Sequence, residues 1–329
     1  MWDFSVGTAI GALTRTWPFI ALRLIVYFAI TFAYVLVTGT SAGIGYGVGY
    51  ITDDPAAYSV WGGLIGFGLT SAVIYFAREY ILYMVKAGHI AVLVEVLDGH
   101  AIPDDRSQID YAQKMVRSRF AQANILFALD QIIKGVLRVV TGTIFTIASI
   151  LPIPVLQTAV KLINSILTLS LTYVDEIILA YNIRTRTENP WESSQQALVL
   201  YAQNYGTFIK NAIWLAIIMW GLAFVGFLFL LAPAGAIMYL MPGPLAGWSF
   251  VLAILLAWSL KAAILEPFAI ACLMQVYFKK IEGQTPDPEW AAKLSSLSAK
   301  FRAMGERAAA WAREPAPVAA SSTPKPATG

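Results

Sequence analysis

Long apolar blocks alternate with short polar stretches along this chain. Six blocks reach the length of about 20 residues that a helix needs to cross a bilayer. They run over Trp17–Gly39 (or on to Ile51), Val60–Met84, Gln122–Leu151, Val155–Tyr181, Phe208–Leu231 and Gly247–Tyr277. The pattern predicts an all-α polytopic membrane protein in which six transmembrane helices form three hairpins.

The polar stretches between these blocks share one plan, which predicts an internal repeat. Each has a turn with a proline, then an amphipathic helix, then a phenylalanine: Pro103 and Phe120, Pro190 and Phe208, Pro286 and Phe301. The predicted units are 1–103, 104–190 and 191–286, each an interfacial helix plus a hairpin, then an amphipathic helix over 287–313 and a disordered tail over 314–329. The alternative is that any hairpins with amphipathic cytoplasmic ends would look alike.

Composition supports a membrane protein and excludes several other classes. The chain is 58% hydrophobic, with a mean hydropathy of +0.64. Its net charge of only +3 argues against a nucleic-acid partner. The single Cys272 cannot form an intrachain disulfide, and neither His89 nor His100 has neighbours at zinc-ligand spacing. We therefore expect no metal and no cofactor.

Basic residues concentrate in alternate connecting stretches. Stretches 51–59, 152–160 and 232–249 contain no Lys or Arg, whereas 99–121, 183–210 and the segment after Tyr277 contain many. Because basic loops stay on the cytoplasmic side, this asymmetry predicts cytoplasmic N- and C-termini. For a bacterial host, the expected location is the inner membrane.

Glycines recur at helical spacing in the first predicted hairpin. They are Gly39, Gly43 and Gly47 on one face, Gly45 and Gly49 on an adjacent stripe, and Gly62 and Gly66 on the next helix. Small residues spaced in this way let two membrane helices approach closely, so we predict a packing seam. A potassium-channel filter is the alternative for the Gly-Tyr-Gly triplet, but it would need a preceding threonine and a separate pore helix.

Several ionisable residues lie inside the predicted spans, where they are costly and therefore indicate a function. The candidates for substrate or ion binding are Glu266, Asp175, Glu176, Asp130, Glu79, Arg78 and Lys261, with Tyr173 as an aromatic neighbour. Pro267 follows Glu266 and predicts a helix break, and a carboxylate beside such a break is typical of transporter sites. The alternative is that these charges pair with one another or reach the cytoplasmic interface.

Tyrosines cluster near the same predicted depth. Tyr75, Tyr80 and Tyr83 lie on the second predicted span, and Tyr173 and Tyr181 on the fourth. With a carboxylate nearby, such rings can hold a quaternary ammonium by cation–π attraction. The alternative, and the more common arrangement, is an interfacial aromatic belt.

Three segments resemble the choline transporter-like family. The segment "YAQNYGTFIKNA" is similar to a family motif through Tyr201, Asn204, Tyr205, Lys210 and Ala212. "RSRFAQANILFALDQIIKGVL" resembles an earlier family helix through Gln131 and Lys134, and "VYFKKIEGQTPDPEWAAKL" resembles the segment after its last helix. The family has ten spans and a large extracellular domain, whereas six spans and no such domain are expected here. The resemblance covers about residues 105–300 and implies transport of choline- or ethanolamine-like cations.

Two functional classes follow from these patterns. The first is a transporter of a small organic cation or another small solute. The second is a non-catalytic membrane scaffold or accessory subunit that binds lipid or a partner membrane complex. An enzyme is not expected, because the sequence has no HExxH, GxSxG or phosphate-loop motif. Expected partners are membrane lipids, a small organic cation, and other subunits in a homo- or hetero-oligomer.

Overall fold

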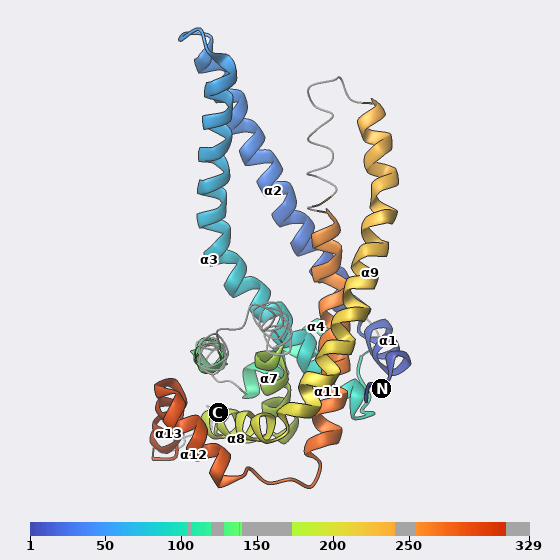
Figure 1. Ribbon diagram of the computed structural model, residues 1–329, viewed down its shortest axis with the longest axis vertical. Coiled ribbons are helices and arrows are strands. Elements are labelled where there is room, and N and C mark those ends of the chain that lie inside the picture. Colours follow the sequence, from blue (N-terminus) through green and yellow to red (C-terminus); the bar gives the residue numbers. More distant parts are fainter. Residues whose placement is uncertain are drawn as a thin grey trace, which may run out of the picture.

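The protein is described by a computed structural model, and the described part of the chain is helical, with no strand in it. It covers residues 1–103, 107–119, 128–137, 139, 173–240, 254 and 256–313; the side chains of 75–81, 117–119, 233–235 and 237–240 are outside the description. The helices in Figure 1 are α1 (Val6–Arg15), α2 (Trp17–Gly49), α3 (Pro55–Leu97), α4 (Ser107–Arg119), α7 (Val174–Thr185), α8 (Pro190–Gln203), α9 (Tyr205–Leu240), the π-helical turn η2 (Lys261–Leu265), α11 (Glu266–Ile281), α12 (Pro288–Leu297) and α13 (Ala299–Trp311).

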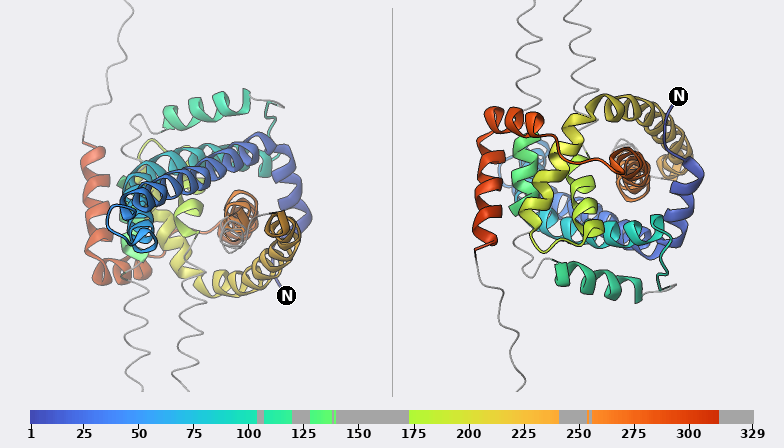
Figure 2. Two further views of the ribbon diagram at one scale, coloured as in Figure 1. Left: turned by 90° about the horizontal axis from the view of Figure 1, so that it is seen from above. Right: turned by 90° about the horizontal axis from the view of Figure 1, so that it is seen from below.

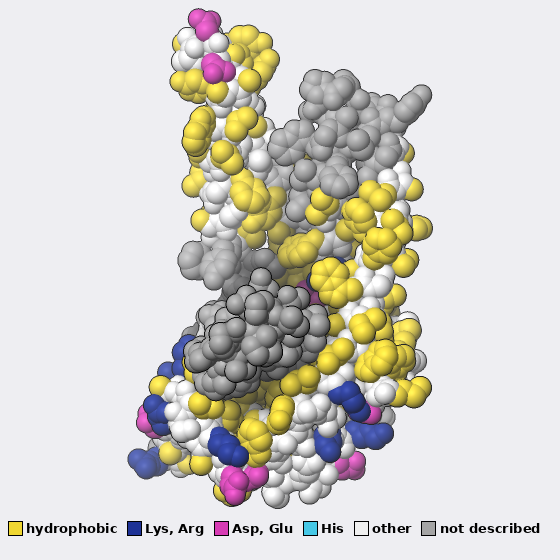
Figure 3. Space-filling view, viewed as in Figure 1, with side chains coloured by type: hydrophobic (Ala, Val, Ile, Leu, Met, Phe, Trp, Pro, Cys, Tyr) yellow, Lys and Arg dark blue, Asp and Glu magenta, His cyan; other side chains and the backbone are white. Residues whose placement is uncertain are grey.

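Four described segments are long and apolar enough to cross a bilayer: Trp17–Gly49, Pro55–Ile74, Tyr205–Ala232 and Leu256–Ile281. In the first three, large side chains face outward, with Phe32 66%, Val73 70% and Phe229 79% exposed, whereas the fourth is largely packed inside the protein. Figure 3 shows these apolar side chains along the upper part of the molecule. An apolar surface of this extent is stable only against lipid, so the protein is embedded in a membrane.

The other two predicted spans lie largely outside the described residues. Of Gln122–Leu151 and Val155–Tyr181, the structure describes mainly the short helical stretch 128–137 and the start of α7. The number of six spans and their grouping into three hairpins therefore stay predictions. The domain division based on the repeat also stays a prediction.

The α2–α3 hairpin has a glycine seam, but its register differs from the predicted one. A Cβ atom on Gly45 would collide with the Tyr58 carbonyl, and one on Gly62 would collide with the Ser41 carbonyl. Gly66 also packs against Ser41, as predicted for a seam residue. By contrast, no neighbour in the described part of the chain lies within 4 Å of the Cβ position of Gly39, Gly43 or Gly47. Contact of α3 with these last three is therefore not observed, because the stripe with Gly45 faces α3 instead.

Helices occur at each predicted interfacial position, as α1, α4, α8 and the α12–α13 pair. The single helix expected over 287–313 is instead two helices that meet at Ser298. This residue has an extended backbone (φ −132°, ψ 113°), and its hydroxyl accepts a hydrogen bond from the Phe301 N–H at 3.3 Å. The serine therefore ends α12 and caps α13. Figure 2 shows α12 and α13 along one edge of the molecule and α1 at the opposite edge.

The predicted helix break at Pro267 is a distortion rather than an interruption. The turn Lys261–Leu265 is π-helical and leads directly into α11, with Pro267 in the first turn of that helix. A proline lacks an N–H, and its ring clashes with the carbonyl four residues earlier. The wider π turn removes this conflict and keeps the helix continuous. It also determines where the Glu266 carboxylate points.

Charge is distributed unequally along the long axis of the molecule. The upper tip of the α2–α3 hairpin carries Asp53 and Asp54, while Lys and Arg side chains gather at the lower end (Figure 3). A hydrocarbon layer of about 30 Å takes about 20 residues of helix. Counted from this tip along α3, which begins at Pro55, the layer ends near Ile74. The remainder of α3 continues into the polar layer formed by α4, α7 and α8.

Candidate functional site

Four of the predicted acidic residues line one cavity. Its volume is about 120 Å³. The lining comes from α2, the lower part of α3, the stretch 128–137, α7 and α11, and consists of Tyr27, Leu82, Tyr83, Lys86, Ile90, Asp130, Lys134, Asp175, Glu176, Leu179 and Glu266. Residues separated by more than 200 positions in the sequence therefore meet at one site.

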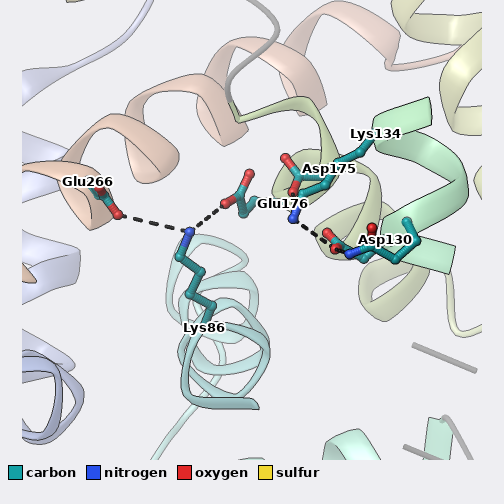
Figure 4. Close-up of polar contacts among 7 residues, drawn as sticks. Lys86, Asp130, Lys134, Asp175, Glu176 and Glu266 are labelled. Carbon is teal, nitrogen blue, oxygen red and sulfur yellow. Dashed lines mark hydrogen bonds and ion pairs between the residues drawn. The ribbon is translucent and has the colours of Figure 1, made fainter. Parts of the chain in front are cut away.

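Lys86 holds one half of this cavity together (Figure 4). Its Nζ lies 3.1 Å from Glu176 Oε1 and 3.9 Å from Glu266 Oε2. Glu176 is in the first turn of α7, where the helix dipole stabilises a negative charge. Glu266 follows the π turn directly. This half thus joins three helices through one ammonium group.

Lys134 organises the other half. Its Nζ is 2.8 Å from Asp130 Oδ2, one helical turn earlier, and 3.7 Å from Asp175 Oδ2 (Figure 4). Gln131 donates a second hydrogen bond to the same Asp130 oxygen at 3.2 Å. The adjacent residues Asp175 and Glu176 therefore face different lysines, and this places both acids at one cavity.

The cavity carries more negative than positive groups. Four carboxylates and two ammonium groups line it, a formal charge of −2 when all six are ionised. Burial lowers the pKa of Lys86, but the charges of Glu176 and Glu266 outweigh burial and raise it overall. Burial and the neighbouring charge of Glu176 raise the pKa of Asp175 above its usual value. The cavity thus combines a firmly charged lysine with an aspartate that holds its proton more strongly than usual.

Arg23, which the sequence reasoning missed, is buried beside this cavity. It lies on α2 one turn before Tyr27 and is only 1% exposed. Its Nε, Nη1 and Nη2 atoms have no hydrogen-bond partner within the described part of the chain. The charge of Arg23 acts on Glu266 and Glu176, so it belongs to the same electrostatic environment. An arginine inside the first apolar block was the available signal.

The other candidates lie elsewhere or cannot be placed. Tyr173 and Lys261 line a second, mostly apolar cavity of about 130 Å³ between α9 and α11. Arg78 and Glu79 lie on α3, but their side chains are outside the described residues. Of the predicted tyrosines, Tyr83 lines the acidic cavity.

Of the residues that carry the family resemblance, Lys134 lines the cavity, whereas those of the Tyr201–Ala212 motif lie at the α8–α9 corner. Tyr201 stacks on Phe208 with a centroid distance of 4.4 Å. Asn204 donates to Gln284 Oε1 at 2.7 Å, and Lys210 lies 2.6 Å from Asp3. These contacts tie α8, α9, the segment after α11 and the N-terminus together. They give the motif a structural role in this chain.

The acidic cavity lies toward the lower end of the membrane layer. Lys86 follows Pro55, the first residue of α3, by 31 residues, which corresponds to about 46 Å of helix and exceeds the hydrocarbon thickness of about 30 Å. Glu266, however, lies within the apolar span Leu256–Ile281. The cavity therefore joins the inner part of one span to the polar layer, and it is not at the centre of the bilayer.

In the ranges that the structure covers, no group of three or more His, Cys, Asp or Glu side chains is arranged to hold a metal ion. The carboxylates of the cavity are instead divided between the two lysines. No protein-family model, curated protein or solved structure matches the chain. What the site does must therefore be argued from its own chemistry.

Proposed function

We propose that this protein is a membrane transporter and that the acidic cavity binds a small organic cation of the choline or ethanolamine class. The observation that carries the proposal is the excess of four carboxylates over two ammonium groups in one cavity. Buried like charges repel one another unless a cation joins them. A bound ammonium group would supply that cation.

The lining is suited to an organic cation. Tyr27 and Tyr83 contribute aromatic rings beside the carboxylates, and ring faces attract ammonium groups, most strongly where water is excluded. A cavity of about 120 Å³ has room for several waters or one compact organic molecule. The resemblance of Tyr201–Ala212 to the choline transporter-like family supports the same substrate class.

The π turn gives the site a means to change shape. π-helical turns inside α-helices occur frequently at functional sites. The turn at Lys261–Leu265 lies directly before Glu266. Glu266 lies 3.9 Å from Lys86 Nζ, whereas Glu176 lies only 3.1 Å from it, so the Glu266 contact is the longer of the two that Lys86 makes. We propose that substrate binding exchanges this contact for one between Glu266 and the ammonium group.

We place the protein in the inner membrane of a bacterium with both termini in the cytoplasm. The support is the positive-inside rule together with the Lys- and Arg-rich lower end of the molecule. The cavity would then lie close to the cytoplasmic side. Lipids cover the exposed apolar faces of α2, α3 and α9, and further subunits can associate through the same faces.

The membrane scaffold is the second candidate, and one observation favours it. Each lysine in the cavity already pairs with two carboxylates, as expected if the charges only join helices. A scaffold of this kind would use α1, α4, α8, α12 and α13 to bind lipid or a partner complex. The two functions differ in whether the cavity binds a solute.

Reconstitution into proteoliposomes tests the proposal. Uptake of labelled choline and ethanolamine would be compared among wild type, Glu266→Gln, Asp175→Asn and the exposed control Glu282→Gln. We expect uptake by wild type and the control, and loss of uptake in the two cavity variants. No uptake by folded wild type, with no thermal stabilisation by any ammonium compound, would reject transport and favour the scaffold.

A further inference from the structure

Arg23 is a buried donor without an acceptor. Its side chain is 1% exposed, and none of its three guanidinium nitrogens makes a hydrogen bond to a described residue. Burying a charged group without partners is strongly unfavourable. A group that supplies acceptor oxygens is therefore expected beside it in the working protein. Guanidinium groups match carboxylates especially well, because their donors form a planar fork.

In the same region, one carboxylate oxygen of Glu176 is an acceptor that receives no hydrogen bond from a described donor. Its Oε1 atom pairs with Lys86 at 3.1 Å, while its Oε2 atom is buried and accepts no hydrogen bond from the described residues. Arg23 is close enough for its charge to act on Glu176 and Glu266. The two unsatisfied groups thus have opposite needs, one for an acceptor and one for a donor.

The cavity reaches Glu176 and comes within one helical turn of Arg23 on α2. Glu176 lines it, and so does Tyr27, one helical turn after Arg23 on the same face of α2. A ligand that satisfied both groups would need an N–H donor and an acceptor of negative charge within one small molecule. A simple cation such as choline provides neither the carboxylate nor the N–H.

We infer that the preferred ligand of the cavity is a zwitterion with an ammonium group and a carboxylate, of the amino-acid type. Its ammonium group donates to Glu176 and displaces Lys86 from Glu266, while its carboxylate binds the guanidinium of Arg23, which turns toward the cavity from α2. This inference rests on the proposed function and narrows its substrate class from any small organic cation to a zwitterion.

Four matched ligands test the two halves of this inference separately. Ethanolamine and glycine are primary amines, while choline and glycine betaine are quaternary; within each pair, the second compound has a carboxylate in place of the hydroxymethyl group. Binding to purified full-length protein would be measured by titration calorimetry. We expect the carboxylate to strengthen binding at least tenfold in each pair, and glycine to bind more tightly than glycine betaine.

Variants assign the two effects to residues. Arg23→Gln should abolish the carboxylate preference and leave ethanolamine binding within about threefold of wild type, whereas the exposed control Arg15→Gln should change nothing. Glu176→Gln should remove the advantage of primary over quaternary ammonium. If Arg23→Gln does not fold, Arg23→Lys keeps the charge but loses the fork, and it should reduce the carboxylate preference.

Each other result has a distinct meaning. Equal binding of amino alcohols and amino acids by wild type would overturn the zwitterion inference, yet it would leave the transporter proposal in place. Equal weakening of all four ligands by Arg23→Gln would also overturn it, because the arginine would then only support the fold. Absence of binding by all four compounds would reject both proposals together.

Discussion

Replacing Lys86 by Met removes the ammonium group that joins α3 to α7 and α11. The side chain of Lys86 is 27% exposed and that of Glu176 is 7% exposed, at a separation of 3.1 Å. At this distance, Coulomb's law gives about 5 kcal/mol for an effective dielectric constant of about 20 and about 1.3 kcal/mol for water. Because the pair is mostly buried, we expect a coupling energy of about 2–4 kcal/mol.

A double-mutant cycle measures this coupling. The free energy of unfolding in mixed micelles would be determined for wild type, Lys86→Met, Glu176→Gln and the double variant. Lys86→Met alone should destabilise the protein by about 3–5 kcal/mol, because it leaves buried carboxylates without a partner. The double variant should be considerably more stable than the sum of the two single effects implies.

The Arg184–Asp98 pair provides a control at a similar distance. Its atoms lie 2.9 Å apart, but the Arg184 side chain is 39% exposed, so the coupling should be about 1 kcal/mol or less. A coupling for Lys86–Glu176 no larger than for this control would refute the reasoning. The cavity would then be open to water, and its charges would be surface ion pairs.

Three further predictions concern packing, pH and the π turn. Gly62→Ala should destabilise the hairpin by about 1–3 kcal/mol, whereas Gly43→Ala should be neutral or stabilise it by up to about 1 kcal/mol, as measured by micellar unfolding. Burial raises the pKa of Asp175. Because the ionised carboxylate adds negative charge to the cavity, ammonium binding measured by calorimetry should strengthen as the pH rises through that pKa. The Asp175→Asn variant should show no such pH dependence. Pro267→Ala should let the π turn relax to an α-helix and so reorient Glu266. Ammonium binding should then weaken several-fold without loss of stability. Unchanged affinity would argue against a role for the turn.

Much of the helical layout was predictable because hydrophobic blocks and proline turns are local signals. The spans starting at Trp17 and near Phe208 agree with the structure to within a few residues at their first ends. The seam register was not predictable in the same way. Two glycine stripes lie side by side on α2, and only the direction in which α3 packs decides that Gly45 rather than Gly43 faces it.

Convergence of the charges was only partly predictable. Acidic residues inside apolar blocks are costly, and that rule selected Asp130, Asp175, Glu176 and Glu266, which do line one cavity. The same rule also selected Lys261, which faces a different cavity. Pairing depends on which helices meet, and helix contacts between segments so distant in sequence are not encoded in local periodicity. Arg23 was missed because it lies near the start of a strongly apolar block.

The pairing inside the cavity bears on how a ligand could enter. Lys86 has two partners, and its contact to Glu176 is 0.8 Å shorter than that to Glu266 (3.1 against 3.9 Å). An incoming ammonium group can therefore take Glu266 while Lys86 keeps Glu176, so that no carboxylate is left without a cation at any step. Because Glu266 adjoins the π turn while Glu176 lies on a regular helix, the exchange would move α11 relative to α3 and α7. Ligand binding would in this way be coupled to a span that carries both a cavity carboxylate and a distorted helical turn.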